Sequence, residues 1–500
     1  MLWACLLFPS LPLDVFARAI APDDARPFVV GSGGHYPRVV AANAAARAAG
    51  IRAEQLVSSA LALAPELVLR DRDSDAQARA LAQLATMALM LTPMACLAPP
   101  NAIVADIGGS LRLFGGLPRV VARLVGGACA LGYATQVGIA PTPGAALLLA
   151  RAGHTQPVTE PAQLPAALAP ISLMLVDLDD ATRATLREAG ITTFGQATSL
   201  PRDGLARRFG ATLVMTLDRA LGRASDPRAS FVPPPHFASR LELPAPVHDV
   251  EALGFGVQRL VQEFATWLTA RGLGAVRLSL ALAHERYVRQ RGIPDTVVPF
   301  ALGTPARLPA HLLGVLRERL ARVTLPAAVE TITLTSEEMA PLAGRNLGLL
   351  PGDDVHAAEI PLLDRLRARL GEEALTRLVP FPEHRPELAM RDAAIATAAG
   401  QAERPARNSR VKPAAVSCLP EASRPIWLLG EPQPVAQLLE MQPWVLRDGP
   451  ERIESGWWDG ADVRRDYYVA DTPAGETVWI YRDHRFGIDD GEWFLHGFFA

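Results

Sequence analysis

The N-terminal third of the chain carries few acidic side chains, and acidic side chains decide whether it can perform metal-dependent chemistry. Asp106 is the sole carboxylate between Asp75 and Glu160. Before Asp23 the sole one is Asp14, which falls in a stretch with helical spacing. Nucleotidyl transfer by a two-metal mechanism needs several carboxylates that converge on ions about 3.5–4 Å apart. One acid cannot hold two divalent ions, so the sequence predicts no two-metal centre and no bound metal or cofactor.

Asp106 lies in the stretch Val104–Gly116, where apolar residues flank the pair Gly108-Gly109. Glycine adopts positive φ without steric cost, and two apolar runs joined by such a pair are typical of a β-hairpin. We therefore expect two short strands joined by a tight turn at Gly108 and Gly109.

Strands and helices alternate around this stretch. The expected strands are Leu2–Phe8, Pro27–Val30, Arg38–Ala42, Glu66–Leu69 and Gln136–Ile139. The expected helices are Leu11–Ile20, Asn43–Ala49, Leu56–Ala64, Asp73–Met90, Leu117–Leu131 and Pro143–Ala152. This order predicts a compact α+β domain over residues 1–160, with residues from about 21–70 inserted as a smaller subdomain.

Residues 161–230 have a helical pattern that is interrupted by glycines and a proline. Short helices joined by glycine turns often contact a nucleic-acid backbone through amides and arginines. Arg202, Arg207 and Arg208 are the candidate contacts. A plain helical bundle with solvated arginines explains the same spacing, so both interpretations stay open.

Residues 231–340 begin with a proline-rich segment that reads as an extended linker. The strands expected after it are Ser239–Leu243, Val276–Ala283, Thr296–Phe300 and Val329–Leu334, with helices at Val250–Arg271 and Pro309–Arg322. This βαββαβ order predicts a four-stranded sheet with two helices on one face.

A basic cluster follows the second of these strands. Arg286, Arg289 and Arg291 surround Tyr287 within a few residues. Clustered arginines with an aromatic neighbour suit contact with nucleic-acid phosphates. An exposed hairpin tip has a similar composition, so that alternative also stays open.

The C-terminal third changes composition twice. Residues 341–384 lead into residues 385–425, which are rich in Ala, Pro, Arg and Ser without an apolar period and are expected to form a flexible linker. Residues 426–500 concentrate aromatic side chains, and the alternating runs Asp466–Val469 and Thr477–Tyr481 predict an antiparallel hairpin in a small β-rich module. Its aromatic residues form either a core or a surface for a partner.

Overall composition limits the class of protein. The net charge is −3, and Lys412 is the only lysine, a bias that a GC-rich genome explains. Cys5, Cys96, Cys129 and Cys418 form no C-x-x-C pair, which argues against a zinc site or a disulfide framework and fits a reducing compartment. No apolar run is long enough for a membrane helix. We therefore expect a cytoplasmic protein without membrane contact.

The order of these parts resembles that of a Y-family translesion DNA polymerase. In that family a palm with inserted fingers is followed by a helical thumb and a βαββαβ little finger. Val39–Arg47 followed by Gly50–Arg52 resembles the family's fingers segment, which contacts the incoming triphosphate. Leu186–Leu205 is similar to its thumb. The resemblance implies an α+β multidomain fold with a polymerase-like right hand and an added β-rich C-terminal module.

The departures from the family are at its functional positions. Pro9 stands where the family's first metal-binding aspartate ends the first strand, and Gly108 and Gly109 are aligned with the acids of its hairpin. Ala44 replaces the fingers tyrosine, which leaves Arg47 as the remnant of the nucleotide contact. The resemblance therefore implies a catalytically degenerate palm.

Degenerate members of this kind act as non-catalytic subunits of a bacterial mutagenic complex in the SOS response to DNA damage. The resemblance implies four partners, namely DNA, the sliding clamp, a RecA-like accessory protein and an error-prone C-family DNA polymerase. The clamp motif of such proteins lies just past the little finger, where Asn346, Leu347, Leu349 and Leu350 occupy the corresponding place. An ordinary loop remains the alternative for these four residues.

Two other functions remain open on the sequence. The chain is a divergent active translesion polymerase if Asp106 acts with further acids brought in from elsewhere by the fold. It is a pure protein-interaction subunit if it never touches DNA.

Overall fold

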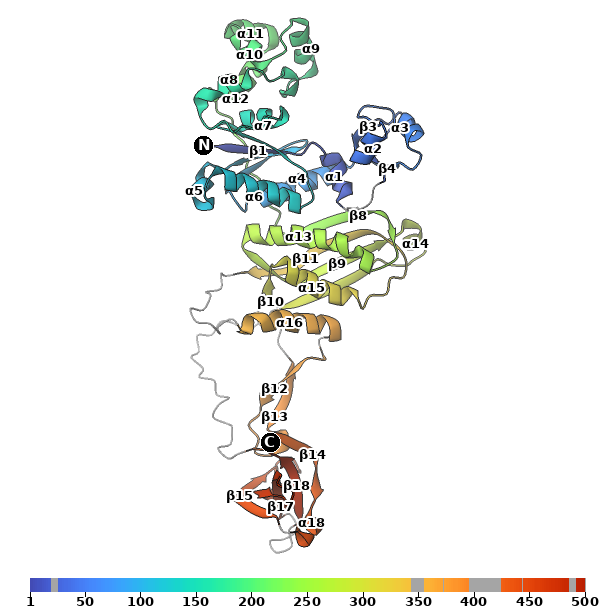
Figure 1. Ribbon diagram of the computed structural model, residues 1–500, viewed down its shortest axis with the longest axis vertical. Helices are drawn as coiled ribbons and strands as arrows, with labels where there is room; N and C mark the ends of the chain where they lie inside the picture. The colour runs from blue at the N-terminus through green and yellow to red at the C-terminus, as the bar shows by residue number, and fades with distance from the viewer. Residues whose placement is uncertain are drawn as a thin grey trace. The chain divides into compact units, whose positions relative to one another are not determined.

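The computed structural model describes residues 1–18, 26–342, 355–371, 373–394, 424–442, 444–484 and 492–499 (Figure 1). The described residues form two compact units, the first ending at Arg369 and the second beginning at Leu370. Helices and strands are mixed in the first unit, and the second is mainly β-structure. The predicted α+β fold class with an added β-rich C-terminal region is confirmed.

The palm sheet lies at the N-terminus of the first unit and is antiparallel in the order β5-β6-β1-β7. Its strands are β1 (Trp3–Leu7), β5 (Ala95–Ala98), β6 (Ala102–Asp106) and β7 (Gln136–Ala140). Three helices cover it, α4 (Ser74–Ala88), α6 (Leu117–Ala130) and α7 (Pro143–Arg151), and α1 (Leu11–Ala17) follows β1.

Strand β1 is apolar throughout because both faces of the palm sheet are covered. Ala4 and Leu6 belong to the core that α4 and α6 form on one face. Cys5 and Leu7 belong to the core that α7 forms on the other face. The expected strand Leu2–Phe8 is therefore confirmed, with bounds two residues shorter.

The fingers elements form a separate three-stranded sheet in the order β3-β2-β4. Its elements are β2 (Phe28–Gly31), β3 (Val39–Ala42), α2 (Ala44–Ala48), α3 (Val57–Leu63) and β4 (Val68–Asp71). Strands β2 and β3 are antiparallel, and β4 joins β2 in parallel. Asn43 caps α2, since its side chain accepts a hydrogen bond from the Ala46 N–H.

The thumb is helical, as predicted. It contains α8 (Leu164–Leu168), α9 (Asp180–Glu188), α10 (Phe194–Ser199), α11 (Arg202–Phe209) and α12 (Ala211–Ala220), with short 3-10 turns at η2 (Pro161–Gln163) and η3 (Leu173–Leu175). Thr193 begins α10 with a capping box to Gln196. Leu168, Phe194 and Leu217 share one core with Cys5 and Leu7, so thumb and palm pack as one body.

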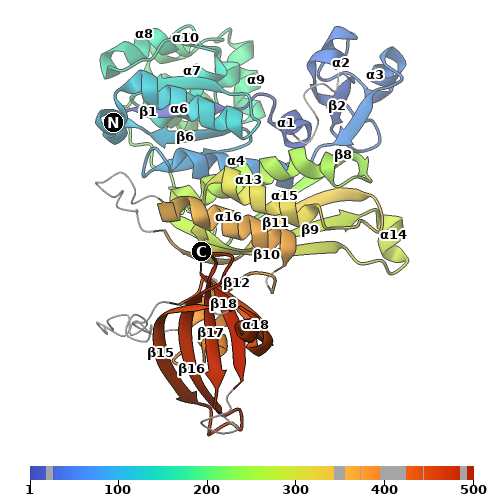
Figure 2. The same ribbon diagram turned by 60° about the horizontal axis from the view of Figure 1, so that its bottom comes forward.

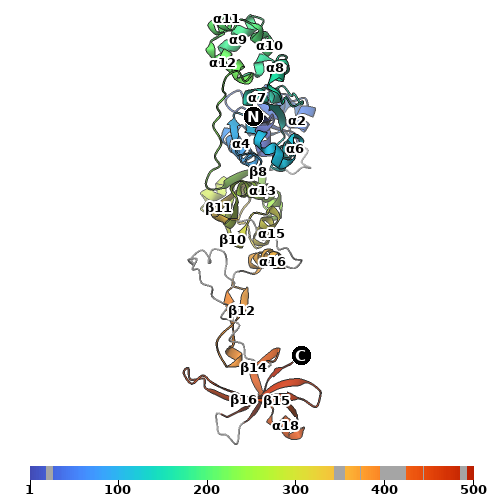
Figure 3. The ribbon, with the colours of Figure 1, turned by 90° about the vertical axis from the view of Figure 1, so that its left-hand side faces the viewer.

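An extended segment leads from α12 along the palm to the little finger (Figure 3). Within it, the Phe231 N–H donates to the Ala95 carbonyl at the edge of the palm sheet, at 2.7 Å. The proline-rich segment is therefore extended, as expected, and it is fixed to the palm at this point.

The little finger has the predicted βαββαβ order. Its elements are β8 (Ala238–Val247), η4 (Glu251–Leu253), α13 (Gly254–Arg271), β9 (Leu273–His284), α14 (Arg286–Gln290), β10 (Thr296–Ala306), α15 (Pro309–Leu320) and β11 (Val329–Pro341). The four-stranded sheet has the order β10-β9-β11-β8. Helices α13 and α15 cover one face (Figure 2) and share its core with Leu280, Phe300 and Ile332. Helix α16 (Val355–Leu370) follows this sheet.

The second unit is built on a five-stranded antiparallel sheet in the order β14-β18-β17-β16-β15. Its elements are β14 (Trp427–Pro434), α18 (Ala436–Met441), β15 (Val445–Ser455), β16 (Val463–Asp471), β17 (Thr477–Asp483) and β18 (Trp493–Phe498). The predicted hairpin is confirmed, because β16 pairs with β17 from Arg465 to Asp471.

The expected linker at 385–425 needs correction at its beginning. Strands β12 (Thr376–Pro380) and β13 (Met390–Ala394) form a hairpin, with η5 (Pro386–Leu388) between them. Arg385 is buried and pairs with Glu383 at 2.8 Å and with Asp459 at 2.6 Å. Charged pairs rather than an apolar period order this segment, so composition alone did not reveal it. Residues 395–423 lie outside the described residues.

In the described part of the chain, no single helix combines the length and apolarity needed to cross a membrane. One helix pair, Gly108–Phe114 with Leu117–Ala130, meets that test jointly by length and composition, and its two members are bent by 95°.

Candidate functional site

The end of β1 that carries Pro9 is the place where a palm would present its first metal ligand. The Phe8 N–H donates to the Asn101 carbonyl at 2.8 Å, and Leu7 pairs with Ala102. Pro9 itself is exposed, and it lies beside the turn that connects β5 to β6. This end of the sheet therefore presents Pro9, Pro100 and Asn101, none of which is a carboxylate.

Gly108 and Gly109 do not lie at the end of the sheet that carries Pro9. Matching these two glycines to the acids of the family's hairpin is therefore wrong. The Ile107 N–H donates to the Leu2 carbonyl at 2.9 Å, and a Cβ on Gly108 would stand 3.1 Å from the Leu2 nitrogen. A strand rises about 3.3 Å per residue, which separates Leu2 from Pro9 by about 20 Å. Since β1 and β6 are antiparallel, the end of β1 faces the beginning of β6, and Asn101 is the residue the alignment missed.

The expected hairpin turn at Gly108-Gly109 is also wrong. Strand β6 ends at Asp106, and the chain then forms η1 (Gly108–Ser110) and α5 (Leu111–Phe114). Neither glycine has a positive φ; the left-handed positions are Gly115 and Gly116, at the break between α5 and α6. The Asp106 carboxylate accepts a hydrogen bond from the Gly108 N–H at 3.0 Å, which begins the 3-10 turn. The Asp106 side chain therefore forms an Asx turn in this fold.

The metal-binding capacity of the palm follows from these positions. Among the described residues, no three His, Cys, Asp or Glu side chains lie close enough together to hold a metal ion. Asn101 offers one neutral amide oxygen, whereas a divalent ion in a transfer site is held by charged oxygens. The donor set at this end does not fit a two-metal centre.

Arg47, the expected nucleotide-binding remnant, is exposed on α2. Its Nη1 donates to the Ala42 carbonyl at 2.5 Å, which holds the side chain against the end of β3. Asn43 fixes the start of the same helix, so the Arg47 side chain has a defined position. The guanidinium N–H groups that do not bond Ala42 can donate to an anion.

The thumb arginines differ from one another in their contacts. Arg202 pairs with the buried Asp218 at 2.5 Å and so connects α11 to α12. Arg207 and Arg208 are exposed, and the Arg208 guanidinium lies 5.6 Å from the Phe209 ring centroid. Arg207 and Arg208 remain candidate phosphate contacts, whereas Arg202 has a structural partner.

The basic cluster after β9 forms the short helix α14, which connects the antiparallel strands β9 and β10, so it is the tip of a hairpin. Val288 is buried and anchors the helix, while Arg286, Arg289 and Arg291 are exposed. Arg291 lies 5.8 Å from the ring centroid of Tyr287. The structure therefore brings these three arginines together on one exposed turn, in a subdomain separate from the thumb arginines.

A further candidate site, not predicted from the sequence, is the open face of the little-finger sheet, opposite α13 and α15. Thr333 of β11 pairs with Ala281 of β9 and with Arg240 of β8. Two residues further along β11, Thr335 pairs with Ser279. Apart from Arg240, these side chains are small or hydroxylated, so a phosphate backbone can approach the sheet closely beside them. The alternation Arg277-Leu278-Ser279-Leu280-Ala281 was the available signal, since it places the small residues on one face.

The aromatic residues of the second unit divide into two groups. Tyr467, Trp479 and Tyr481 are buried in its core. Trp427, Trp457 and Trp458 are exposed by 67%, 72% and 59%. The core interpretation is therefore confirmed for the first group, and a surface for a partner stays a prediction for the second.

The four residues assigned to clamp binding, Asn346, Leu347, Leu349 and Leu350, lie outside the described residues.

Comparison of this chain with known proteins found a matching family, sequence relatives and solved structures. Residues 17–151 match the impB/mucB/samB family. Protein ImuB from two strains of Caulobacter vibrioides is 30% identical over 477 residues, which cover 90% of this chain and 100% of that protein. DinB from Sulfolobus solfataricus is 16% identical, covers 67% of this chain and 98% of its own, and gives a TM-score of 0.38. An insertion ternary complex of Dbh DNA polymerase has the same identity and coverage, with a TM-score of 0.39.

Proposed function

Because the chain belongs to the ImuB family, we propose that it is a non-catalytic, polymerase-shaped scaffold in bacterial translesion synthesis. The observation that carries this proposal is the set of residues at the Pro9 end of the palm sheet. Pro9, Pro100 and Asn101 stand there, and Asp106, the sole acid between Asp75 and Glu160, accepts a hydrogen bond from the Gly108 N–H at the opposite end of β1. A palm of this composition keeps its shape without the charges that nucleotidyl transfer requires.

DNA is the first partner of the proposed scaffold. Arg286, Arg289 and Arg291 on α14, with Arg207 and Arg208 on α11, supply exposed guanidinium groups for phosphates. The small side chains on the open little-finger face give a backbone room to approach. Contacts of this kind fix a duplex in place without reading its sequence, which suits a protein that acts wherever a lesion occurs.

Protein partners complete the proposal. Asn346, Leu347, Leu349 and Leu350 form the sliding-clamp motif, which would deliver the scaffold to replication sites. The exposed tryptophans of the second unit are a surface for recruiting an error-prone C-family DNA polymerase and a RecA-like accessory protein. We place the complex in the cytoplasm as part of the SOS response.

Primer extension tests the absence of catalysis. With purified full-length protein and either Mg²⁺ or Mn²⁺, we expect no nucleotide incorporation, because no set of carboxylates converges in the described palm. An active Y-family polymerase in the same assay serves as the control. Robust extension that Asp106→Ala abolishes would establish the alternative, a divergent active polymerase.

Clamp binding has a separate test. The double variant Leu347→Ala/Leu349→Ala should lose retention on immobilised sliding clamp, because it removes the apolar side chains of the motif. The matched control is Leu362→Ala/Leu370→Ala, which removes two leucines that are exposed by 55% and 52% outside the motif. Retention that is equal in the motif variant and the control would refute the assignment.

A further inference from the structure

A buried polar cluster connects the palm to the little finger. Arg18 follows α1 of the palm and is 8% exposed, and Glu263 on α13 of the little finger is 3% exposed. The Arg18 Nη1 donates to the Glu263 Oε1. We call Arg18, Gln83, Ser239 and Glu263 the junction cluster.

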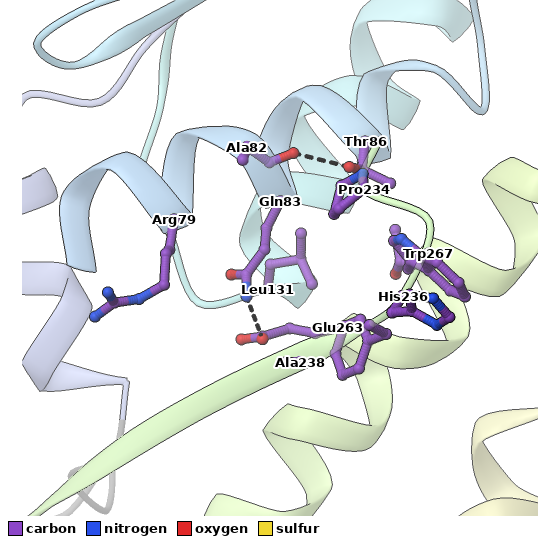
Figure 4. Close-up of a pocket in the computed structure, with 12 residues that line it drawn as sticks. Arg79, Ala82, Gln83, Thr86, Leu131, Pro234, His236, Ala238, Glu263 and Trp267 are labelled. Atoms are coloured by element: carbon purple, nitrogen blue, oxygen red, sulfur yellow. Dashed lines mark hydrogen bonds between the residues drawn. The ribbon is translucent and has the colours of Figure 1, made fainter. Parts of the chain in front are cut away.

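Each oxygen of Glu263 has a partner in this cluster. The second one, Oε2, accepts from the Ser239 hydroxyl at 2.5 Å and from the Gln83 amide at 2.7 Å. Figure 4 shows Gln83 of α4 and Glu263 of α13 pointing toward each other, joined by that hydrogen bond. Both carboxylate oxygens are therefore satisfied, as a buried charge requires.

Arg18 is held on its other side by an aromatic ring. Its guanidinium carbon lies 5.5 Å from the ring centroid of Tyr133. Burial, the largest single effect, would lower the pKa of Arg18, but the charge of Glu263, the charge of Tyr133 and the hydrogen bond to Glu263 together outweigh it, so the pKa is raised. Arg18 therefore stays charged despite its burial.

A second contact comes from the same face of α13. Arg259 precedes Glu263 by one helical turn, and its Nη1 donates to the Ala130 carbonyl at the end of α6, at 2.9 Å. The side chains of Leu260 and Phe264 instead enter the core of the little finger. One face of α13 thus packs on its own sheet, while another makes polar contacts with the palm.

Apolar packing does not fill this junction. A cavity of about 120 Å³ lies beside the cluster, lined by Gln83, Leu131, His236, Glu263 and Trp267 (Figure 4). Among the described residues, the little-finger core holds no palm side chain, and the palm core holds no side chain of α13. Directional polar contacts must therefore select how α13 sits on α4.

We propose that Arg18 and Glu263 are positioning residues that hold the little finger against the palm in one orientation. A rotated little finger would leave one of the two charges buried without its partner, which is strongly unfavourable, whereas the paired arrangement satisfies both. The pair selects the orientation and sets where the open sheet face stands before DNA arrives. The consequence for DNA rests on the proposed function; the positioning itself does not.

A distance measurement tests the positioning without DNA. Cys129 is exposed on the palm, and Thr324→Cys adds an exposed site on the little finger, in a Cys418→Ser background; Cys5 and Cys96 are buried. Spin labels at these two sites should give one narrow distance distribution in the full chain. Glu263→Gln should broaden it, because Arg18 loses its counter-charge. The exchange Arg18→Glu/Glu263→Arg should narrow it again.

Two further variants keep the test decisive if the charge exchange does not fold. Arg18→Met/Glu263→Met removes both charges and should also give a broad distribution. Asp180→Asn is the matched control, since it breaks the exposed pair with Arg183 in the thumb and should leave the distribution narrow. A narrow distribution at the original distance in Glu263→Gln or in the double methionine variant would overturn the proposal, as would a broad one in the unmodified chain.

DNA affinity then separates positioning from direct contact. If one molecule in ten of Glu263→Gln holds the correct orientation, its apparent affinity falls about tenfold. The slope of affinity against salt concentration should not change, because the number of phosphate contacts in the complex is the same. If the unmodified chain binds no DNA while the distance results hold, the proposed function fails and the positioning stands.

Discussion

Replacing Arg286, Arg289 and Arg291 together by glutamine is expected to weaken DNA binding and to flatten its dependence on salt. The three guanidiniums stand on one exposed turn, and Arg286 and Arg291 form no ion pair with a described residue. Each phosphate contact contributes about 0.9 to the slope of log K against log salt, so three contribute up to about 2.7. Raising salt from 50 to 200 mM should therefore weaken the unmodified chain by up to about 40-fold more than the variant.

The matched control for this variant changes the same net charge on other elements of the same subdomain. It uses three exposed arginines: Arg317 on α15, Arg322 in the turn after α15, and Arg369 on α16. Their replacement by glutamine should leave the salt slope close to that of the unmodified chain. Equal losses in both triple variants would mean that bulk charge, not α14, sets the affinity. Binding that neither triple variant alters, or no binding at all, would support the alternative of a pure protein-interaction subunit.

Replacing Asp14 by asparagine is expected to stabilise the palm above neutral pH. Asp14 is on α1, and its Oδ2 is buried without a hydrogen-bond partner among the described residues. Burial raises the pKa of Asp14 from 3.8 to about 7, and a hydrogen bond from the Ala134 backbone lowers it by less. At about 1.4 kcal/mol per pKa unit, ionisation of this group costs the folded palm up to about 4 kcal/mol.

The sign of the pH dependence follows from that raised pKa. Between about pH 4 and pH 7 the folded state holds the Asp14 proton while the unfolded state releases it, so the free energy of unfolding falls as pH rises. Asparagine carries no charge, and the advantage of the variant should grow by about 2 kcal/mol between pH 5.5 and pH 8. Arg18, Tyr133, Glu263 and Arg259 surround the site and are unchanged in the variant.

Amide hydrogen exchange in β1 and β6 measures this effect locally, because a chain of several subdomains does not unfold in one step. Protection should increase in Asp14→Asn relative to the unmodified chain at pH 8, and by less at pH 5.5. A constant difference between the two proteins across this range would show that Asp14 is ionised throughout.

Several parts of the fold are predictable because their sequence signals are local. The continuous apolar run of β1 identifies a strand covered on both faces, and the alternation in β9 identifies a sheet covered on one. The β16–β17 hairpin follows from its two alternating runs in the same way.

Other features depend on contacts between distant residues and have no local signal. The expectation that Gly108 and Gly109 lie at the same end of the sheet as Pro9 is wrong, because a local motif does not show which strand ends meet in an antiparallel pair. Arg385 looked like part of a linker because its partner Asp459 is remote in sequence. Arg18 and Glu263 are 245 positions apart, and neither residue type predicts burial on its own.

The hairpin β12–β13 also determines where the described chain passes from the first unit to the second. Ala394 and Arg424 both belong to the second unit, so the described chain passes from one unit to the other only at Arg369–Leu370. Arg385 with Asp459, and Arg465 with Glu387, attach the hairpin to the C-terminal sheet. Insertions or deletions in residues 395–423 therefore leave the length of that connection unchanged.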